Sequence, residues 1–239
     1  MTDLKLNSEC LVILAGSPRG GEKTWKSLNK NVLLPLKADL AICTDIWEED
    51  NLLGDLAKYK WIIERFDNYE TYYENNFTGT WKQYFDTGKK TGLYSSGLIH
   101  FLFKDIVKNN YMSILNNYKF IIYSRFDQYY LDKHPELDED KILIPKGEDY
   151  YGICDRHAAV PVKFISEFLD ICNYIDSKEA IKEAPKFNNC ETTFLNHLIS
   201  RDLIKNVKRT DRIQFTSSLK HEKTNWRIPK YKIYFFKDL

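Results

Sequence analysis

Several features that would assign a chain to a class of protein are missing from this sequence. Its five cysteines include no Cys-x-x-Cys pair and form no cluster with histidine, which predicts reduced, mostly buried thiols and no zinc site. Lys and Arg number 35 and Asp and Glu number 34, so the formal net charge is +1. Proteins that bind nucleic acid usually show a basic excess, and we therefore expect no nucleic-acid partner.

Long apolar runs are also missing. No stretch approaches the roughly 18 consecutive apolar residues of a membrane-spanning helix. Residues 1–10 are polar and charged where a signal peptide would be apolar, and no internal repeat or low-complexity linker is present. We therefore expect a cytoplasmic protein without a transmembrane segment, folded as a single domain over residues 1–239.

The sequence does contain short apolar runs that alternate with amphipathic segments. Buried strands are predicted at residues 10–15, 39–44, 118–123 and 141–145. Helices are predicted at residues 24–35, 98–107 and 161–175, and residues 188–191 are predicted to cap another. The remaining assignments are helix and loop for 50–75, a mobile surface segment for 81–91 and a strand for 231–236. This alternation predicts an α/β fold with a mainly parallel sheet and flanking helices.

Polar residues follow the first two predicted strands. Residues 16–21 form a glycine-rich turn that matches neither the Gly-x-Gly-x-x-Gly motif nor the P-loop. Its backbone N–H groups, together with Ser17 and Arg19, are predicted to bind the phosphates of a nucleotide, although Arg19 would also suit a solvated loop. Thr44 and Asp45 end the second strand and are predicted to hold a base or ribose, with a helix cap or turn as the alternative.

The most informative stretch is the buried run Phe120–Tyr123, which ends in Arg125 and Asp127. Two residues that are two positions apart in an extended chain point to the same side. A carboxylate at the edge of an open sheet suits a divalent cation that carries a phosphate ligand, so Asp127 is the predicted metal ligand. Arg125 is predicted to contact sugar or phosphate, and an ion pair within the strand end is the alternative for both residues.

In this order, these blocks resemble a family of capsule, lipopolysaccharide and large-DNA-virus glycosyltransferases. The resemblance covers roughly residues 10 to 200 and rests on Gly16–Arg19 with Thr24-Trp25, 39–45, 123–127, 147–160, and Cys190-Glu191 followed by Leu195. It implies a GT-A-like fold that transfers a sugar from a nucleotide-diphosphate donor, with a UDP-sugar favoured, to a glycan or glycolipid acceptor. It also implies Mn²⁺ or Mg²⁺, with Mn²⁺ favoured.

The resemblance assigns roles to further residues. Glu191 and Asp155 are the candidate catalytic residues, Arg156 is a donor-binding residue, and His221 is a second metal ligand because GT-A enzymes often use a late histidine. The alternatives are stabilisation of a helix dipole for Glu191, and a turn aspartate followed by a surface arginine for Asp155 and Arg156. Residues 1–128 would then form the nucleotide-sugar half, and residues 129–239 the acceptor half. Arg125 stands where a full Asp-x-Asp motif has its first aspartate.

Two other functions remain open at this stage. One is a catalytically inactive carbohydrate- or partner-binding domain on a GT-A-like fold, which the incomplete Asp-x-Asp motif favours. The other is a nucleotidyltransferase on a similar sheet, which would release pyrophosphate in place of a nucleoside diphosphate.

Overall fold

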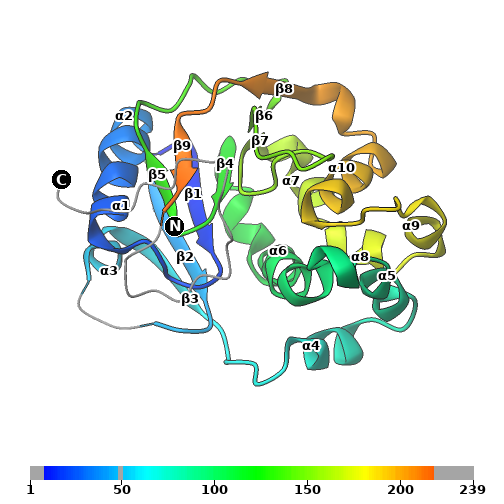
Figure 1. Ribbon diagram of the computed structural model, residues 1–239. Coiled ribbons are helices and arrows are strands. Elements are labelled where there is room, and N and C mark those ends of the chain that lie inside the picture. The colour runs from blue at the N-terminus through cyan, green and yellow to red at the C-terminus, as the bar shows by residue number, and fades with distance from the viewer. Residues whose placement is uncertain (1–7, 48–50, 218–239) are drawn as a thin grey trace.

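In the computed structural model, which describes residues 8–47 and 51–217, helices cover both faces of a seven-stranded sheet (Figure 1). The strand order is β3-β2-β1-β4-β7-β6-β8, and β7 alone runs against the other six. The strands are β1 (Cys10–Ala15), β2 (Asp39–Thr44), β3 (Ala57–Ile62), β4 (Phe120–Ser124), β6 (Ile142–Pro145), β7 (His157–Pro161) and β8 (Val207–Thr210). The predicted α/β fold with a mainly parallel sheet is confirmed.

A short antiparallel ribbon and a series of helices complete the described residues. The ribbon pairs β5 (Gln128–Tyr130) with β9 (Gln214–Thr216). The α-helices are α1 (Gly21–Leu28), α2 (Leu34–Leu36), α3 (Leu52–Leu56), α4 (Tyr69–Asn76), α5 (Trp81–Thr87), α6 (Leu93–Leu115), α7 (Val162–Leu169), α8 (Ile171–Ile175), α9 (Lys178–Glu183) and α10 (Cys190–Ser200). A π-helix, η1 (Asn29–Leu33), joins α1 to α2, and the 3₁₀-helices are η2 (Lys89–Thr91) and η3 (Ile204–Asn206).

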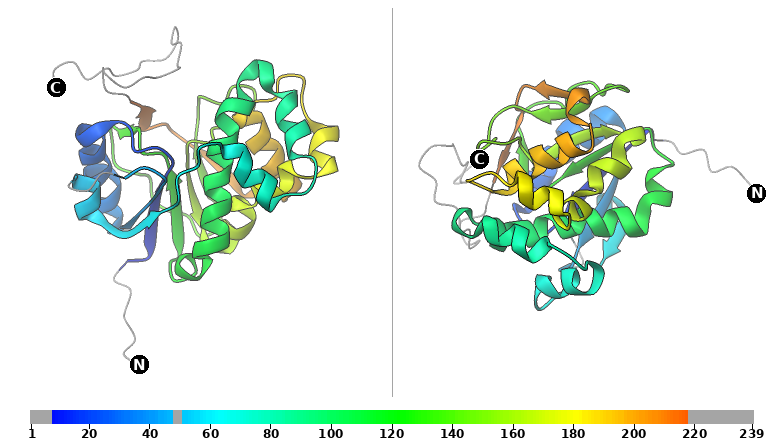
Figure 2. Two further views of the ribbon diagram at one scale, coloured as in Figure 1. Left: turned by 90° about the horizontal axis from the view of Figure 1, so that it is seen from below. Right: turned by 90° about the vertical axis from the view of Figure 1, so that its right-hand side faces the viewer.

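The core lies in two layers, one on each face of the sheet. Successive side chains of β1 point to opposite faces, as in any strand. Leu11 and Ile13 pack among the side chains of α6, α7, α8 and α10, whereas Val12 and Leu14 pack among those of α1 and α3. Figure 2 shows the corresponding separation of α1 and α3 from the larger group of helices. Burial on both faces explains why the strands at the centre of the sheet are continuous apolar runs.

The segment 81–91 is not the mobile surface segment that was predicted. It forms α5 and η2, and Trp81, Tyr84 and Phe85 are buried in the core. The Asp176 carboxylate accepts hydrogen bonds from the backbone N–H groups of Gly79 and Trp81, at 3.0 and 3.1 Å, and so satisfies donors at the start of the helix. The segment is polar along its sequence, but its aromatic side chains share one buried side.

Three strands of the sheet were not predicted: β3, β7 and, at the edge beside β6, β8. β3 lies in the segment assigned to helix and loop, because lysines alternate with aromatic residues in an edge strand that pairs only with β2. β7 follows a run of charged residues and begins with His157, yet all five of its residues are buried. It inserts between β4 and β6 and pairs antiparallel with both.

The predicted helices differ from the structure at their ends. The first begins at Gly21 and continues as helical turns beyond Pro35, and α6 extends the predicted 98–107 segment on both sides to 23 residues. The predicted helix 161–175 is divided at Asp170, whose carboxylate pairs with Lys108 and Arg201. No helix of the described residues, α6 included, is long and apolar enough to cross a membrane. The strand predicted at 231–236 lies outside the described residues.

Candidate active site

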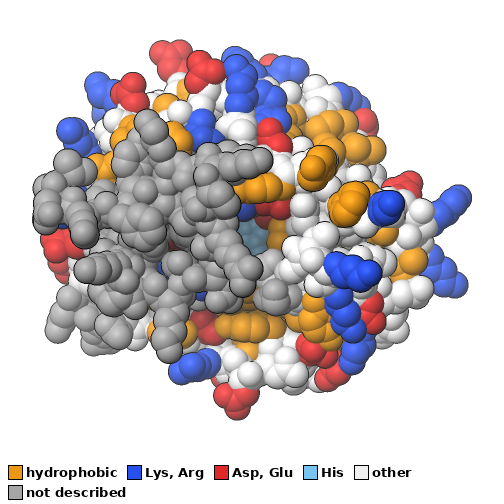
Figure 3. Space-filling model, viewed as in Figure 1, with side chains coloured by type: hydrophobic (Ala, Val, Ile, Leu, Met, Phe, Trp, Pro, Cys, Tyr) orange, Lys and Arg blue, Asp and Glu red, His pale blue; other side chains and the backbone are white. Residues whose placement is uncertain are grey.

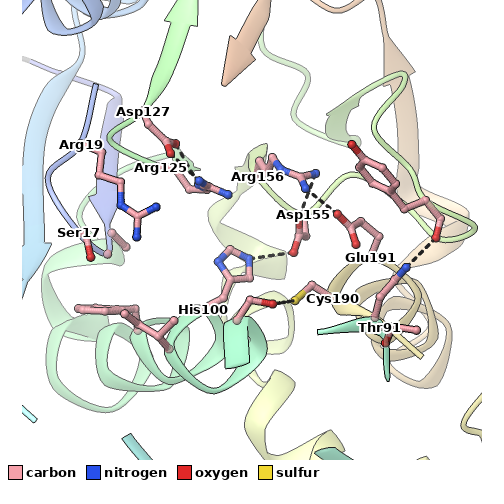
Figure 4. Close-up of a pocket in the computed structure, with 17 residues that line it drawn as sticks. Ser17, Arg19, Thr91, His100, Arg125, Asp127, Asp155, Arg156, Cys190 and Glu191 are labelled. Carbon is pink, nitrogen blue, oxygen red and sulfur yellow. Dashed lines mark hydrogen bonds and ion pairs between the residues drawn. The ribbon is translucent and has the colours of Figure 1, made fainter. Parts of the chain in front are cut away.

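A cavity of about 420 Å³ opens at the carboxyl ends of β1 and β4 (Figure 4). These neighbouring strands form the point where the strand order reverses, because β2 and β3 follow on one side of β1 and β4 lies on the other. Ligands of open α/β sheets bind in the crevice at such a switch point. Figure 3 shows this hollow, with histidine at its floor and hydrophobic side chains along part of its rim.

Two walls face each other across the cavity. We call the turn after β1 and the end of β4 the β1–β4 wall, and the loop before β7 with the start of α10 the α10 wall. Seven of the predicted site residues line the cavity and are thereby brought together: Ser17, Arg19, Arg125 and Asp127 on the β1–β4 wall, and Asp155, Arg156 and Glu191 on the α10 wall.

The glycine-rich turn of the β1–β4 wall fits closely against the end of β4. Gly20 has φ +91°, and a Cβ atom on it would lie 3.1 Å from the Cα atom of Asp127. Only glycine combines this left-handed backbone with so close an approach. The turn therefore leads into α1, an eight-residue helix whose N-terminus lies beside Asp127. Helix N-termini carry unpaired N–H groups and favour anions.

Arg19 reaches into the cavity from the same turn. Within residues 8–47 and 51–217, its guanidinium has no hydrogen-bond or ion-pair partner, although its backbone carbonyl accepts a hydrogen bond from Trp25 Nε1 at 3.3 Å. Figure 4 shows the side chain pointing into the cavity toward Arg125. An unpaired guanidinium in this position can bind a carboxylate or a phosphate.

Arg125 and Asp127 form a bidentate ion pair. Arg125 Nε donates to Asp127 Oδ1 at 2.9 Å, and Nη2 donates to Oδ2. The Asp127 side chain is 3% exposed and that of Arg125 is 25% exposed. The structure therefore matches the alternative prediction for Arg125 and Asp127, an ion pair at the end of the strand.

This geometry bears on the predicted metal ion. In the described part of the chain, no three His, Cys, Asp or Glu side chains lie close enough together to hold a metal. Mg²⁺ bound with a substrate phosphate needs only one or two protein carboxylates, and Asp127 can supply one. The described residues thus fit a cation that arrives with a diphosphate, and do not form a complete metal site of their own. His221, the second predicted ligand, lies outside the described residues.

On the α10 wall the charged groups form a connected network. Arg156 Nη2 donates to Glu191 Oε1 at 2.7 Å, Arg156 Nη1 lies 3.7 Å from Asp155 Oδ1, and Asp155 Oδ2 lies 3.1 Å from His100 Nε2. The sheet register explains how the two walls meet. Ser124 of β4 pairs with His157 of β7, so the residues just beyond them, Arg125 and Arg156, emerge at the same end of the sheet.

The two carboxyl groups of the α10 wall have opposite acidities. Burial, and then the negative charge of Asp155, raise the pKa of Glu191 to about 7. Burial alone would raise the pKa of Asp155 too, but His100 and Arg156 hold it below its ordinary value. Two neighbouring acids whose pKa values are driven apart are typical of sites that move protons. Of these two carboxyl groups, Glu191 is therefore the one that can exchange a proton near neutral pH.

His100 and Lys104, on α6, are members of this network that the sequence reasoning missed. His100 Nε2 lies 3.1 Å from Lys104 Nζ as well as from Asp155, and a single ring nitrogen cannot accept from one and donate to the other at once. Lys104 is fully buried, and burial lowers its pKa to about 8. Burial and then Lys104 lower the pKa of His100. The available signal was that His100 and Lys104 lie four positions apart, and so on one helix face, in the stretch 98–104, whose other residues are apolar.

Thr44 and Asp45 do not line the cavity. Thr44 is fully buried, and its hydroxyl bonds to the carbonyl and N–H of Ile46, as a turn residue would. Asp45 is 7% exposed and accepts a hydrogen bond from Tyr69 through Oδ2 at 3.2 Å, while its Oδ1 has no hydrogen-bond partner within residues 8–47 and 51–217. Asp45 thus offers a buried acceptor at the end of β2.

Comparison with known proteins adds no family to this description: no protein-family model matches the chain, and no curated protein shows significant sequence similarity to it. The functional argument therefore depends on the geometry of the cavity.

Proposed function

We propose that this chain is a GT-A-like glycosyltransferase that moves a sugar from a nucleotide-diphosphate donor to a glycan or lipid-linked acceptor. The observation that carries the proposal is one cavity lined by three guanidinium groups, those of Arg19, Arg125 and Arg156, and by a proton-exchanging carboxylate. Sugar transfer requires the leaving diphosphate to be neutralised. For an inverting transfer it also requires a base for the acceptor hydroxyl. The cavity offers groups for both tasks.

The donor would bind along the β1–β4 wall. The N–H groups of the glycine-rich turn and the N-terminus of α1 would receive the diphosphate, and Arg19 would pair with it. Asp45 lies just beyond β2, outside the lining of the cavity, and we keep it as the proposed contact to the ribose or base on that side of the donor. We favour a UDP-sugar as the donor.

The acceptor hydroxyl would be activated on the α10 wall. With a pKa of about 7, Glu191 is substantially ionised at neutral pH and can take the hydroxyl proton. Arg156 fixes the position of this carboxylate through its 2.7 Å hydrogen bond. Asp155 stays ionised and keeps a negative charge beside Glu191, which makes the Glu191 carboxylate a stronger base.

A divalent cation would add to this arrangement. Mn²⁺ or Mg²⁺ bound with the donor would help to neutralise the charge of the departing diphosphate. Asp127 is the residue that would hold it, once Arg125 turns from Asp127 to the phosphate oxygens.

The test is a thermal-shift screen of UDP, GDP, CDP and ADP, each with and without Mn²⁺. A ligand at 100 times its dissociation constant adds about 2.7 kcal/mol of stability, which raises the melting temperature visibly. We expect UDP to stabilise the protein, and Mn²⁺ to increase the shift. The proposal fails if none of the four nucleotides raises the melting temperature with or without Mn²⁺.

One observation favours a second function, a carbohydrate- or partner-binding domain without catalysis. Asp127 is already neutralised by Arg125, and it belongs to no group of three potential metal ligands among the described residues. Such a domain would bind saccharide but would neither hydrolyse nor transfer a donor sugar. Release of UDP from UDP-glucose, UDP-galactose or UDP-N-acetylglucosamine separates the two, because only the enzyme releases UDP.

A further inference from the structure

Three aromatic side chains gather at the rim of the cavity. Among the described residues, Tyr150, Tyr151 and Phe187 are the aromatic side chains that are largely exposed, by 41%, 91% and 59%. The rings of Tyr151 and Phe187 lie at 26° to each other with centroids 6.4 Å apart. The other described aromatic residues are buried or half-buried. In the part of the chain that the structure describes, largely exposed aromatic side chains are therefore confined to this place.

The loop that carries Tyr150 and Tyr151 has a strained backbone. Glu148, Tyr150 and Tyr151 have φ values of +50°, +41° and +72°, which makes this loop the main site of left-handed non-glycine backbone in the described chain. Each such residue costs about 1–3 kcal/mol and persists only where the surroundings fix it. Strain of this kind is common in ligand-binding loops.

Contacts with the start of α10 fix the loop. Asn189 Nδ2 donates to the carbonyl of Tyr150 at 3.0 Å, and the N–H of Ile153 donates to the carbonyl of Glu191 at 3.1 Å. Gly152 lies so close to α10 that a Cβ atom on it would be 2.1 Å from the carbonyl oxygen of Glu191. The loop that carries Tyr150 and Tyr151 is thus packed directly against the residue proposed as the base.

The aromatic pair is continuous with the cavity. Tyr150 lines the cavity and lies over the guanidinium of Arg156, 5.4 Å from its ring centre. Tyr151 follows it directly, and Phe187 precedes another lining residue, Asn189, by two positions. An extended ligand that has one end in the cavity and runs past Tyr150 would therefore reach the rings of Tyr151 and Phe187.

We propose that Tyr151 and Phe187 bind the sugar rings of a saccharide acceptor while the end of that saccharide reaches Glu191. This inference rests on the proposed function for the role of Glu191. A pyranose ring offers an apolar C–H face to a flat aromatic ring and leaves its hydroxyls at the edge for polar groups. Aromatic walls with a few polar groups are typical of ligand sites, and Asn189 and Arg156 supply polar groups here.

The size of the patch argues for a saccharide over a protein partner. A stable protein–protein interface buries about 1,200–2,000 Å² in total, which is far more than three side chains can cover. Lys186, whose ammonium lies 5.8 Å from the centre of the Phe187 ring, also limits the apolar area. A short, neutral, amphipathic chain fits the patch better.

The experiment measures binding of four hexasaccharides, maltohexaose, laminarihexaose, chitohexaose and mannohexaose, with UDP and Mn²⁺ present. Saturation-transfer NMR detects contact with the sugars, and calorimetry gives the affinity. We expect at least one saccharide to bind, and the double variant Tyr151→Ala/Phe187→Ala to weaken it about tenfold. Tyr151→Phe keeps the ring and should bind normally. The control Ile199→Ala removes a side chain that is 52% exposed on the same helix, α10, and should have no effect.

The result separates this inference from the proposed function. The double variant should keep the thermal shift with UDP, because its changes lie outside the donor side of the cavity. If UDP binds but no hexasaccharide binds, or if the double variant binds the saccharide as well as the wild type, the inference is wrong and the proposed function stands. If saccharide binds through these rings and no nucleotide does, the inference stands and the transferase proposal fails. A dimer in solution that the double variant abolishes would overturn the inference in favour of a second copy of the chain.

Discussion

The two walls of the cavity carry their charges in different ways. On the β1–β4 wall, the guanidinium of Arg19 has no hydrogen-bond or ion-pair partner within the described residues, and that of Arg125 pairs only with its near neighbour Asp127. On the α10 wall, Asp155, Arg156 and Glu191 are joined in a network that continues into α6. An unpaired cation gains a partner when an anion binds, whereas a network is in place beforehand and needs no reorganisation during a reaction. The comparison predicts that the first wall governs affinity and the second governs rate and stability.

The largest effect is expected from Glu191→Gln. Glutamine can still accept the hydrogen bond from Arg156 but cannot act as a base, so transfer should fall by about 10²–10⁴-fold while UDP binding is unchanged. In the wild type, kcat/KM should rise with pH and level off above about 7, where Glu191 is ionised. Steady-state kinetics over pH 5 to 9 (roughly two units either side of that pKa) and calorimetry with UDP measure both. If the affinity for UDP fell as much as the rate of transfer, the assignment of affinity to the β1–β4 wall and of rate to the α10 wall would be wrong.

The same variant tests the linkage of Glu191 to stability. Its pKa is about 7 in the folded protein against an ordinary value of 4.5, so the folded state binds a proton that the unfolded chain has released. The resulting stabilisation is fully present below about pH 4.5 and is lost as the pH rises through about 7. Urea unfolding of wild type and Glu191→Gln across this range should show this decline only in the wild type. Parallel pH profiles would mean that Glu191 titrates normally.

Arg156→Ala should give the largest loss of stability. It leaves the Glu191 and Asp155 carboxylates close together, buried and without their shared cation, which typically costs about 3–5 kcal/mol. Denaturant unfolding measures the loss. Arg156→Lys is the matched control, because it keeps the charge and should recover part of the stability. Unchanged stability in the alanine variant would show that the network is not preorganised as described.

Arg19→Ala tests whether the β1–β4 wall governs affinity. Its guanidinium has no ion pair to lose, so we expect stability to change by less than about 0.5 kcal/mol. A hydrogen bond to a charged group is worth about 1.5–3 kcal/mol, so UDP affinity should fall by about 10- to 100-fold. Calorimetry with UDP measures the affinity, and Lys26→Ala, which changes an exposed lysine of α1, is the control. A large loss of stability with normal UDP binding would reverse the assignment of Arg19.

The smallest effect is expected from Asp127→Asn. It removes the carboxylate available to a cation, so the extra stabilisation that Mn²⁺ gives to the UDP complex should disappear. We expect the affinity for UDP with Mn²⁺ to fall about three- to tenfold, because the diphosphate supplies other ligands to the ion. The affinity without Mn²⁺ should be retained. A Mn²⁺ effect of the wild-type size in this variant would exclude Asp127 as a metal ligand.

The sequence predicted best where local pattern and tertiary environment agree. β1, β2, β4 and β6 are apolar runs buried on both faces, and all were found within a few residues of their ends. β3 was missed because an edge strand needs only one buried side, and its lysines can remain in water. β7 was missed because the residues before it are charged, and their burial depends on ion pairs within the folded α10 wall.

The candidate site shows the same division. Arg125, Asp127 and Glu191 were singled out because each follows or starts a predicted element, and Asp155 through the resemblance of residues 147–160; the structure lines one cavity with all four. Thr44 was placed in the site by the same rule, yet its side chain is turned into the backbone of its own turn. Position at a strand end identifies candidates, but the direction of each side chain depends on the residues packed around it.

By itself, the sequence determined the α/β class, the glycine-rich turn after β1 and the short spacing of Arg125 and Asp127, because strand burial, backbone freedom and side-chain alternation act over a few residues. The tertiary structure decided which charges meet. Arg156 lies beside Glu191 although 35 positions separate them, and His100 contacts Asp155 across 55 residues of chain. The raised pKa of Glu191 follows from these contacts. Burial and a neighbouring charge arise only in the folded protein, and no single stretch of the chain contains them.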